Sequence, residues 1–168
     1  VGFTCAAGQE RGVLDAYNQS DHDVPWVFSS GMFGGDLPSY YEGFYSASLS
    51  SAQTQAYFEL VRRLPDIDQP RAYSVNAYDA LFLMACAAEQ AGEASGPAIA
   101  ETIQSVSGGS GHTVSVGDFG RVRSLTDAGR AVNYQGASGS VDLTGDLELL
   151  SSYLIERVTD GSVESLEL

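Results

Sequence analysis

The sequence contains no lysine, and its 8 basic residues face 22 acidic residues, which gives a formal net charge of −14. Nucleic-acid binding is disfavoured, because affinity for nucleic acids depends on neutralising phosphates with basic side chains. A negative surface also opposes docking on anionic lipid. Solubility, adaptation to salt or a GC-rich genome accounts for the acidic excess, which does not favour an anionic ligand.

The sequence also lacks long apolar runs and paired cysteines. No run of 18 apolar residues exists, so we expect no membrane span. The segment Val1–Cys5 has no basic region, so we expect no signal peptide in this chain. Cys5 and Cys86 lie far apart, without the spacing of a zinc or redox motif, and we expect both to be free thiols.

Catalytic motifs are missing as well. There is no HExxH, no GxSxG and no P-loop lysine. His22 lies in a polar connector and His112 follows the glycine-rich segment 108–111, which lacks the flanking elements of a phosphate cradle. We therefore predict no catalytic residue, no metal ligand, no cofactor and no enzymatic activity. An α/β hydrolase-like or transferase fragment remains the alternative, and it requires a hydroxyl nucleophile beside His22 or His112.

The patterns that are present alternate between strand and helix, which is typical of an α/β fold. A strand at 1–4, a helix at 9–17 and a strand at 24–28 have the spacing of a parallel crossover. A third strand is predicted at 43–49, and a strand, turn and strand between 141 and 161. Helices are predicted over these ranges: 51–64, 73–91, 95–106 and 117–128.

Several residues predict where helices begin and end. Ser50 or Ser51 is suited to cap the helix that follows, and Ser95 with Pro97 opens another. Gly92 is placed to end the helix at 73–91. Apolar residues lie on more than one face of that helix, so we expect it to be buried nearly all round.

Four motifs resemble the type I periplasmic ligand-binding proteins, the branched-chain amino acid type of ABC-transporter substrate-binding protein. They are Asn-Tyr-Gln-Gly-Ala-Ser-Gly at 133–139 with Gly-Asp at 145–146, Ala-Tyr-Asp-Ala at 77–80, Gly-Asp-Phe through Ala-Gly-Arg at 117–130, and Tyr-Glu-Gly-Phe-Tyr at 41–45. Their order follows that of the family. The resemblance covers most of the chain and is confined to the family's carboxyl-terminal half.

The resemblance implies a three-layer α/β fold with parallel sheets. This chain would supply parts of two lobes of that fold, and the fold would be incomplete. Residues 1–47 and 140–168 would belong to lobe II and share a sheet, and residues 48–139 would belong to a helix-rich lobe I. The chain would cross between lobes near 46–48 and again near 136–139. The amino-terminal half of the family fold would be absent.

The candidate ligand-binding residues follow the first two strands, because ligands of open α/β sheets meet the carboxyl ends of strands. Tyr73, at the start of the central helix, is a further candidate from the opposite lobe. The family's amino-acid binders place a carboxylate near Gly31, but no acid lies between Val24 and Gly35, so a free α-amino acid is disfavoured. The predicted ligand-binding residues are Thr4, Cys5, Ala6, Ser30, Gly31, Met32 and Tyr73.

The function implied is that of an extracytoplasmic solute-binding protein, periplasmic or extracellular, with a membrane anchor on the intact protein as an alternative. It would capture an amino acid, an amide or a related small metabolite by hinge closure and present it to the permease of an ABC transporter. The alternative is a ligand-sensing receptor domain of the same fold. A homodimer is also expected, through surfaces that the absent half would cover.

Overall fold

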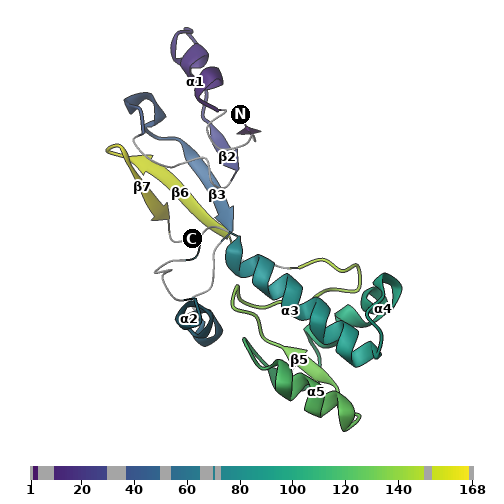
Figure 1. Ribbon diagram of the computed structural model, residues 1–168. Coiled ribbons are helices and arrows are strands. Elements are labelled where there is room, and N and C mark those ends of the chain that lie inside the picture. The colour runs from purple at the N-terminus through teal and green to yellow at the C-terminus, as the bar shows by residue number, and fades with distance from the viewer. Residues whose placement is uncertain are drawn as a thin grey trace. The chain divides into compact units, whose positions relative to one another are not determined.

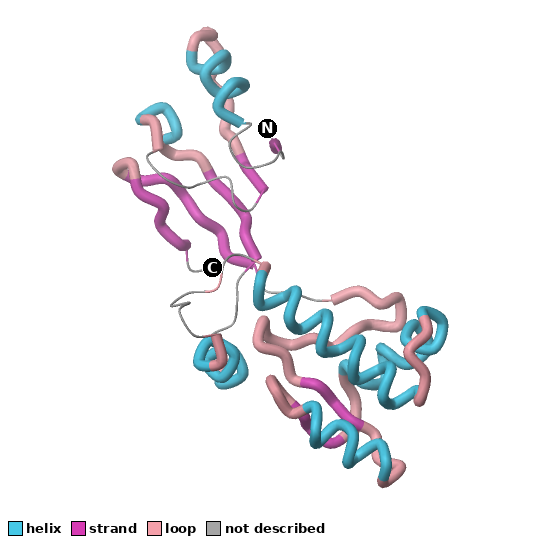
Figure 2. The backbone as a smooth tube through the Cα atoms, viewed as in Figure 1, coloured by secondary structure: helices cyan, strands magenta, loops and turns pink. Residues whose placement is uncertain are grey.

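The structure is a computed structural model that describes residues 2–3, 10–29, 37–49, 54–64, 70, 73–149 and 153–166. The chain divides into two compact units, and Figures 1 and 2 show their elements. Unit 1 comprises Val1–Ser50 and Ser152–Leu168, and unit 2 comprises Ser51–Ser151. The elements are β1 Gly2–Phe3, α1 Glu10–Asn18, β2 Val27–Ser29, η1 Ser39–Tyr41, β3 Tyr45–Leu49, α2 Gln55–Arg62, α3 Ser74–Ala91, α4 Gly96–Ser107, β4 His112–Val114, α5 Phe119–Asp127, β5 Val132–Tyr134, β6 Tyr153–Thr159 and β7 Ser162–Leu166.

The described part of unit 1 contains a mixed sheet with strand order β1-β2-β3-β6-β7. β1, β2 and β3 are parallel, whereas β6 joins β3 and β7 joins β6 in antiparallel pairs. Residues from the two ends of the chain therefore share one sheet, as the sequence predicts. The β6–β7 hairpin turns at Asp160 and Gly161, whose φ angles of 51° and 73° suit the right-handed twist of the strands.

Aromatic side chains fill the core of unit 1. The rings of Trp26 and Phe28 stack with their centroids 5.8 Å apart, and Phe44 lies 5.6 Å from Phe28. Buried Leu14 from α1 and Val158 from β6 complete this cluster. The buried rings of Trp26, Phe28 and Phe44 therefore anchor the segments 24–28 and 43–49 in the core, whereas Val27 is 48% exposed.

Unit 2 is built around α3, which packs against α4 and α5 and against a short sheet of β4 and β5. β4 and β5 are parallel, in register from His112↔Val132 to Val114↔Tyr134, with α5 as the crossover between them. Phe82 of α3 stacks on Tyr134 at 4.7 Å, so the core lies between the helix and the sheet. Gly92 ends α3 with a φ of 70°, which confirms the predicted C-terminal glycine.

Local helix signals are confirmed in one case and wrong in another. Ser95 caps α4 by accepting a hydrogen bond from the backbone N–H of Ala98 at 3.4 Å, as expected. For α2 the cap is Thr54, whose side chain accepts from Tyr57 N at 3.1 Å, so the prediction of a cap at 50 or 51 is wrong. Three serines and threonines compete within a few residues there, and side-chain geometry selects among them.

Three other expectations differ from the structure. Residues 112–114, read as loop, form β4, while residues 141–143, read as strand, form only an isolated bridge between Leu143 and Leu149. α3 is not buried all round, because Leu81 is 65% exposed and Met84 41% exposed. Residues 136–139, interpreted as a crossing between lobes, lie inside unit 2, as do residues 140–149.

Candidate functional site

The predicted ligand-binding residues of unit 1 are Thr4, Cys5, Ala6, Ser30, Gly31 and Met32, and they lie outside the described residues. The strands that precede them are described. β1 and β2 are parallel neighbours, with Gly2 opposite Val27 and Phe3 opposite Phe28. The carboxyl ends of these two strands therefore reach the same edge of the sheet, which is the edge where the sequence places the ligand.

Tyr73, the remaining candidate, lies in unit 2 directly before α3. Its φ of 66° places it in the left-handed region, which is uncommon for a residue with a Cβ atom. Its backbone carbonyl accepts a hydrogen bond from Ala77 N at 2.9 Å, and the residue is 51% exposed. Because Tyr73 belongs to unit 2 and the two strand ends to unit 1, its role in a shared site stays a prediction.

A buried carboxylate was missed by the sequence reasoning. Asp79 of α3 is 2% exposed, and its two oxygens accept four hydrogen bonds. The donors to Oδ1 are the Tyr134 hydroxyl at 2.6 Å and Ala137 N at 2.9 Å. The donors to Oδ2 are Ser138 N and Ser138 Oγ, each at 2.6 Å. These contacts satisfy the buried charge with neutral dipoles, which is the condition for retaining it inside a protein.

The same contacts explain two of the motifs that carried the resemblance. Asp79 comes from Ala-Tyr-Asp-Ala, and all of its donors come from Asn-Tyr-Gln-Gly-Ala-Ser-Gly. A Cβ atom on Gly136 would lie 2.6 Å from Asp79 Oδ2 and 2.6 Å from Val141 Cγ1, so only glycine allows this approach. Burial, and then the hydrogen bond to Asp79, raise the pKa of Tyr134, so this tyrosine remains a donor at neutral pH.

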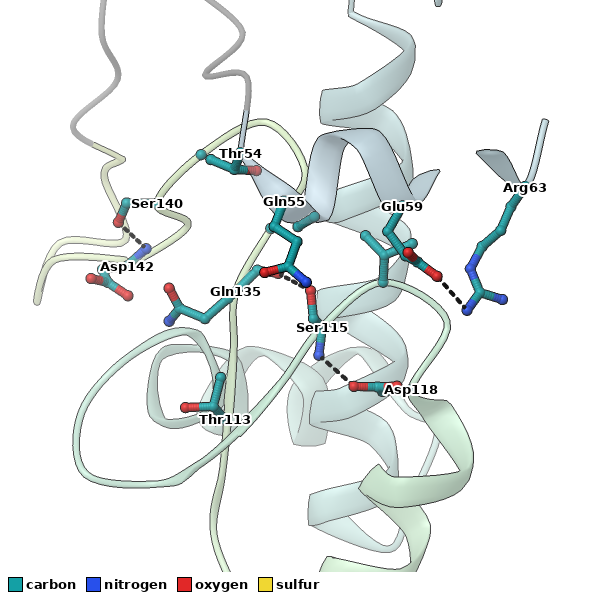
Figure 3. Close-up of a pocket in the computed structure, with 14 residues that line it drawn as sticks. Thr54, Gln55, Glu59, Arg63, Thr113, Ser115, Asp118, Gln135, Ser140 and Asp142 are labelled. Atoms are coloured by element: carbon teal, nitrogen blue, oxygen red, sulfur yellow. Dashed lines mark hydrogen bonds and ion pairs between the residues drawn. The ribbon is translucent and has the colours of Figure 1, made fainter. Parts of the chain in front are cut away.

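A polar groove of about 700 Å³ lies in unit 2, beside the Asp79 network. Figure 3 shows side chains entering it from α2 and from the segments that follow β4 and β5. Because β4 and β5 are parallel, their carboxyl ends meet at this edge. The groove is lined by Thr54, Gln55, Ala56, Glu59, Arg63, Thr113, Ser115, Val116, Asp118, Gln135, Gly136, Gly139, Ser140 and Asp142.

Carboxylates outnumber cations in the groove. Asp118 is held by Ser115 N, which donates to its Oδ2 at 3.2 Å, and the hydroxyl of Ser115 donates to the carbonyl of Gln135 at 3.2 Å. Asp142 lies beside Gly108 and donates its backbone N–H to Ser140 Oγ at 3.3 Å. Glu59 is the third acid among the described lining residues, and it is paired with Arg63, whose guanidinium also lines the groove.

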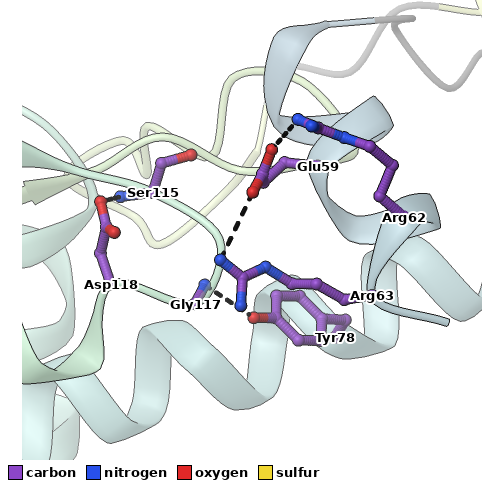
Figure 4. A network of polar contacts seen from close by, with 7 residues as sticks. All are labelled: Glu59, Arg62, Arg63, Tyr78, Ser115, Gly117 and Asp118. Carbon is purple, nitrogen blue, oxygen red and sulfur yellow. Dashed lines mark hydrogen bonds and ion pairs between the residues drawn. The ribbon is translucent and has the colours of Figure 1, made fainter.

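Arg63, at the end of α2, lies beside the turn that precedes α5, as Figure 4 shows. Its Nη2 atom lies 3.4 Å from Glu59 Oε1, and its guanidinium would lie 2.6 Å from a Cβ atom on Gly117. Gly117 N donates to the hydroxyl of Tyr78 at 3.1 Å, so α3 holds the other side of the turn. Burial raises the pKa of Tyr78, whereas the hydrogen bond from Gly117 and the charge of Arg63 lower it.

The described residues hold no group of three or more histidine, cysteine or acidic side chains arranged for a metal ion. Over the same part of the chain, no hydroxyl hydrogen-bonds the imidazole of His22 or His112, which are both exposed and belong to different units. Cys86 is buried and free, as expected, and burial raises the pKa of its thiol to about 12.

Residues 17–161 match the model of the receptor family ligand binding region. The chain belongs to this family of type I periplasmic ligand-binding proteins, which confirms the resemblance predicted from the motifs. Within the described helices, none combines the length and the apolar character needed to cross a membrane.

Two relatives illustrate the match. The chemotactic signal transduction system substrate-binding protein BasB of Halobacterium salinarum is 41% identical over all 168 residues, which correspond to 41% of its own length. The leucine binding protein LivK of Thermotoga maritima superposes with a TM-score of 0.64 at 17% identity, over 99% of this chain and 43% of LivK. The likeness to LivK confirms the predicted α/β fold. The chain spans about two fifths of the length of both relatives.

Proposed function

We propose that this chain is part of an extracytoplasmic solute-binding protein that captures a small polar or amphipathic metabolite between two lobes. The observation that carries the proposal is the family match over residues 17–161, together with 41% identity to a protein named as a substrate-binding protein. Under this proposal, residues 1–47 and the final hairpin belong to lobe II, and the helix-rich unit 2 belongs to lobe I.

The connectivity supports a mechanism of hinge closure. The chain leaves unit 1 after Ser50 and returns to it at Ser152, so two connections join the units. Each unit has its own hydrophobic core, so each is able to move as a body while the connections absorb the change in backbone angles. A ligand that contacts both lobes stabilises the closed form by its differential affinity for that form, and no covalent step is required.

The proposed lobe II contacts are the residues that follow β1 and β2, namely Thr4, Cys5, Ala6, Ser30, Gly31 and Met32, with Tyr73 added from lobe I. They supply hydroxyls, backbone amides and a few apolar atoms, which is the mixture found in small-molecule sites. No acid lies between Val24 and Gly35 to pair with a ligand ammonium. An amide or an aromatic acid therefore fits better than a free α-amino acid, because an unpaired ammonium in a closed cleft is costly.

The test is a thermal-shift and calorimetric screen of the protein at its natural length with leucine, isocaproamide and benzoate. Isocaproamide, which keeps the leucine side chain but has no ammonium group, or benzoate should raise the melting temperature and reduce the radius of gyration in solution scattering. Ser30→Ala should weaken binding by about tenfold, the loss expected for one hydrogen bond in a closed site. Ser105→Ala, on the exposed side of α4, is the matched control. A protein that responds to none of the three compounds, and does not compact, contradicts the proposal.

Two versions of this function differ in the protein that recognises the closed form. An ABC transporter permease is the first candidate. The name of BasB, a substrate-binding protein of a chemotactic signal transduction system, favours a signalling receptor as the second. Deleting the gene distinguishes them, because loss of ligand uptake with normal chemotaxis identifies the transporter. Loss of the chemotactic response with normal uptake identifies the receptor.

A further inference from the structure

Both the location and the volume of the groove in unit 2 are typical of a ligand-binding site. It lies where the parallel strands β4 and β5 end, and the first turn of α2 faces it with Thr54, Gln55 and Ala56. Ligands of parallel α/β sheets meet the protein at the carboxyl ends of strands, where loops present polar groups on a rigid support. A volume of about 700 Å³ lies within the range of small-molecule sites.

The two walls of the groove offer uncommitted donors and acceptors. Gln55 on α2 is exposed, and its amide makes no hydrogen bond with any residue that the structure describes. On the opposite wall, the same is true of the Asp142 carboxylate. Gln135 donates from Nε2 to Asn133 at 2.9 Å, which orients its carbonyl oxygen as an acceptor. The hydroxyls of Thr113 and Ser140 add groups that both donate and accept.

Charge and lining restrict the ligand. Among the described residues, the groove is lined by three carboxylates and by the guanidinium of Arg63, which is already paired with Glu59, so an anion would meet net repulsion. Within the lining that the structure describes there is no aromatic side chain, and the apolar side chains are those of Ala56 and Val116, so a flat apolar ring has nothing to stack on. The acceptor oxygens of Asp142 and Gln135 favour a ligand that donates several hydrogen bonds.

We propose that the groove between α2 and the carboxyl ends of β4 and β5 binds a small, neutral molecule that carries several hydroxyl groups. Asp142 and Gln135 accept hydrogen bonds from neighbouring ligand hydroxyls, and Gln55 closes over the ligand from α2. Arg63 pairs with Glu59, and its guanidinium lies beside the Gly117 turn. All of the described lining residues belong to unit 2.

The experiment titrates the isotope-labelled full chain with sorbitol, gluconate and 1-amino-1-deoxysorbitol, which share a polyol chain and differ in charge. The side-chain amide NMR signals of Gln55 and Gln135 report binding at the site itself. They should shift saturably with sorbitol and with the amine. Gluconate should bind at least about tenfold more weakly, because one repulsive charge in a solvated groove costs roughly 1.4 kcal/mol. Shifts that do not saturate, or equal binding of gluconate, overturn the proposal.

A pair of variants tests the assignment of Asp142. Asp142→Asn should raise the dissociation constant for the amine about fivefold or more and reduce the discrimination against gluconate, since it removes one carboxylate from the groove. Asp127→Asn makes the same charge change on an exposed site of α5 and should leave both quantities unchanged. Identical behaviour of the two variants overturns the proposal. Ser30→Ala should not affect this titration, so its outcome is independent of the outcome for the site in unit 1.

Discussion

Ser138 donates both its backbone N–H and its hydroxyl to the same carboxylate oxygen of Asp79, each over 2.6 Å. The two residues are 59 positions apart in sequence, and the bonds join the middle of α3 to the segment after β5. Since the carboxylate is buried and receives four neutral donors, it acts as a fixed point around which the chain between 134 and 138 is folded.

Asp79→Asn should destabilise the protein. The substitution replaces one acceptor oxygen by an NH2 group, so at least one donor from the 137–138 segment faces another donor in a buried site. We expect a loss of about 2–4 kcal/mol in the free energy of unfolding, which is typical of a buried polar group left unsatisfied. Urea denaturation followed by circular dichroism measures it, with Asp127→Asn as the control. A loss below about 0.5 kcal/mol would show that the network contributes little.

Gly136→Ala should destabilise the protein for a steric reason. The added methyl group would lie 2.6 Å from both Asp79 Oδ2 and Val141 Cγ1, and neither neighbour is the free end of a flexible chain. We expect a loss of roughly 1–3 kcal/mol, as for overpacking in a close-packed interior. Gly145→Ala is the matched control, because its Cβ atom would meet nothing within 4 Å. Equal unfolding free energies for the two variants would contradict the close approach seen here.

Cys86 should be chemically inert in the native protein. Burial raises the pKa of its thiol to about 12, and the thiolate is the species that attacks an alkylating reagent. Because the folded pKa lies above the unfolded one, the stabilising contribution is complete below the unfolded pKa of about 8.5 and is lost as the pH rises toward 12. Iodoacetamide at pH 8, read by peptide mass spectrometry, should label Cys86 only after urea is added. Rapid native labelling of that peptide would refute this.

The sequence predicts a structural feature well when residues close in sequence determine it, and poorly when distant residues do. Gly92, Ser95 and the Asp160–Gly161 turn act through their own neighbours, and their roles were predictable. The segment 136–139 was misread because glycine and serine also suit a free connection, and the partner that fixes it, Asp79, is distant in sequence. β4 was missed because a strand of three residues is too short to display an alternating pattern.

The two candidate sites also differ in whether local sequence or contacts between distant segments determine them. The strand ends after β1 and β2 followed from the strand, helix and strand pattern, and the parallel pairing of those strands agrees with it. The groove in unit 2 was not predictable, since its lining runs from Thr54 to Asp142 and depends on how α2 is placed against β4 and β5. A hint existed in the density of polar residues after each of these strands, but nothing in the sequence linked them to α2.

The apolar face of α3 has a consequence for association. Leu81 and Met84 are 65% and 41% exposed, and the neighbouring exposed positions Ala77 and Ala80 are also apolar. A helix that is apolar on its exposed face as well as its buried one is normally covered by another layer. We therefore expect the 168-residue chain to self-associate through this face, in line with the predicted homodimer.

The double substitution Leu81→Gln and Met84→Gln should shift this chain toward monomer, because it replaces exposed apolar area with polar groups at the centre of that face. The unfolding free energy should change by less than about 1 kcal/mol, since both side chains are largely exposed already. Sedimentation velocity at several protein concentrations measures the shift. Val13→Gln, an exposed apolar residue of α1 in unit 1, controls for a general gain in solubility. A parent chain that is monomeric at every concentration would contradict the expected self-association. A double variant that associates as strongly as the Val13 control would place the interface elsewhere.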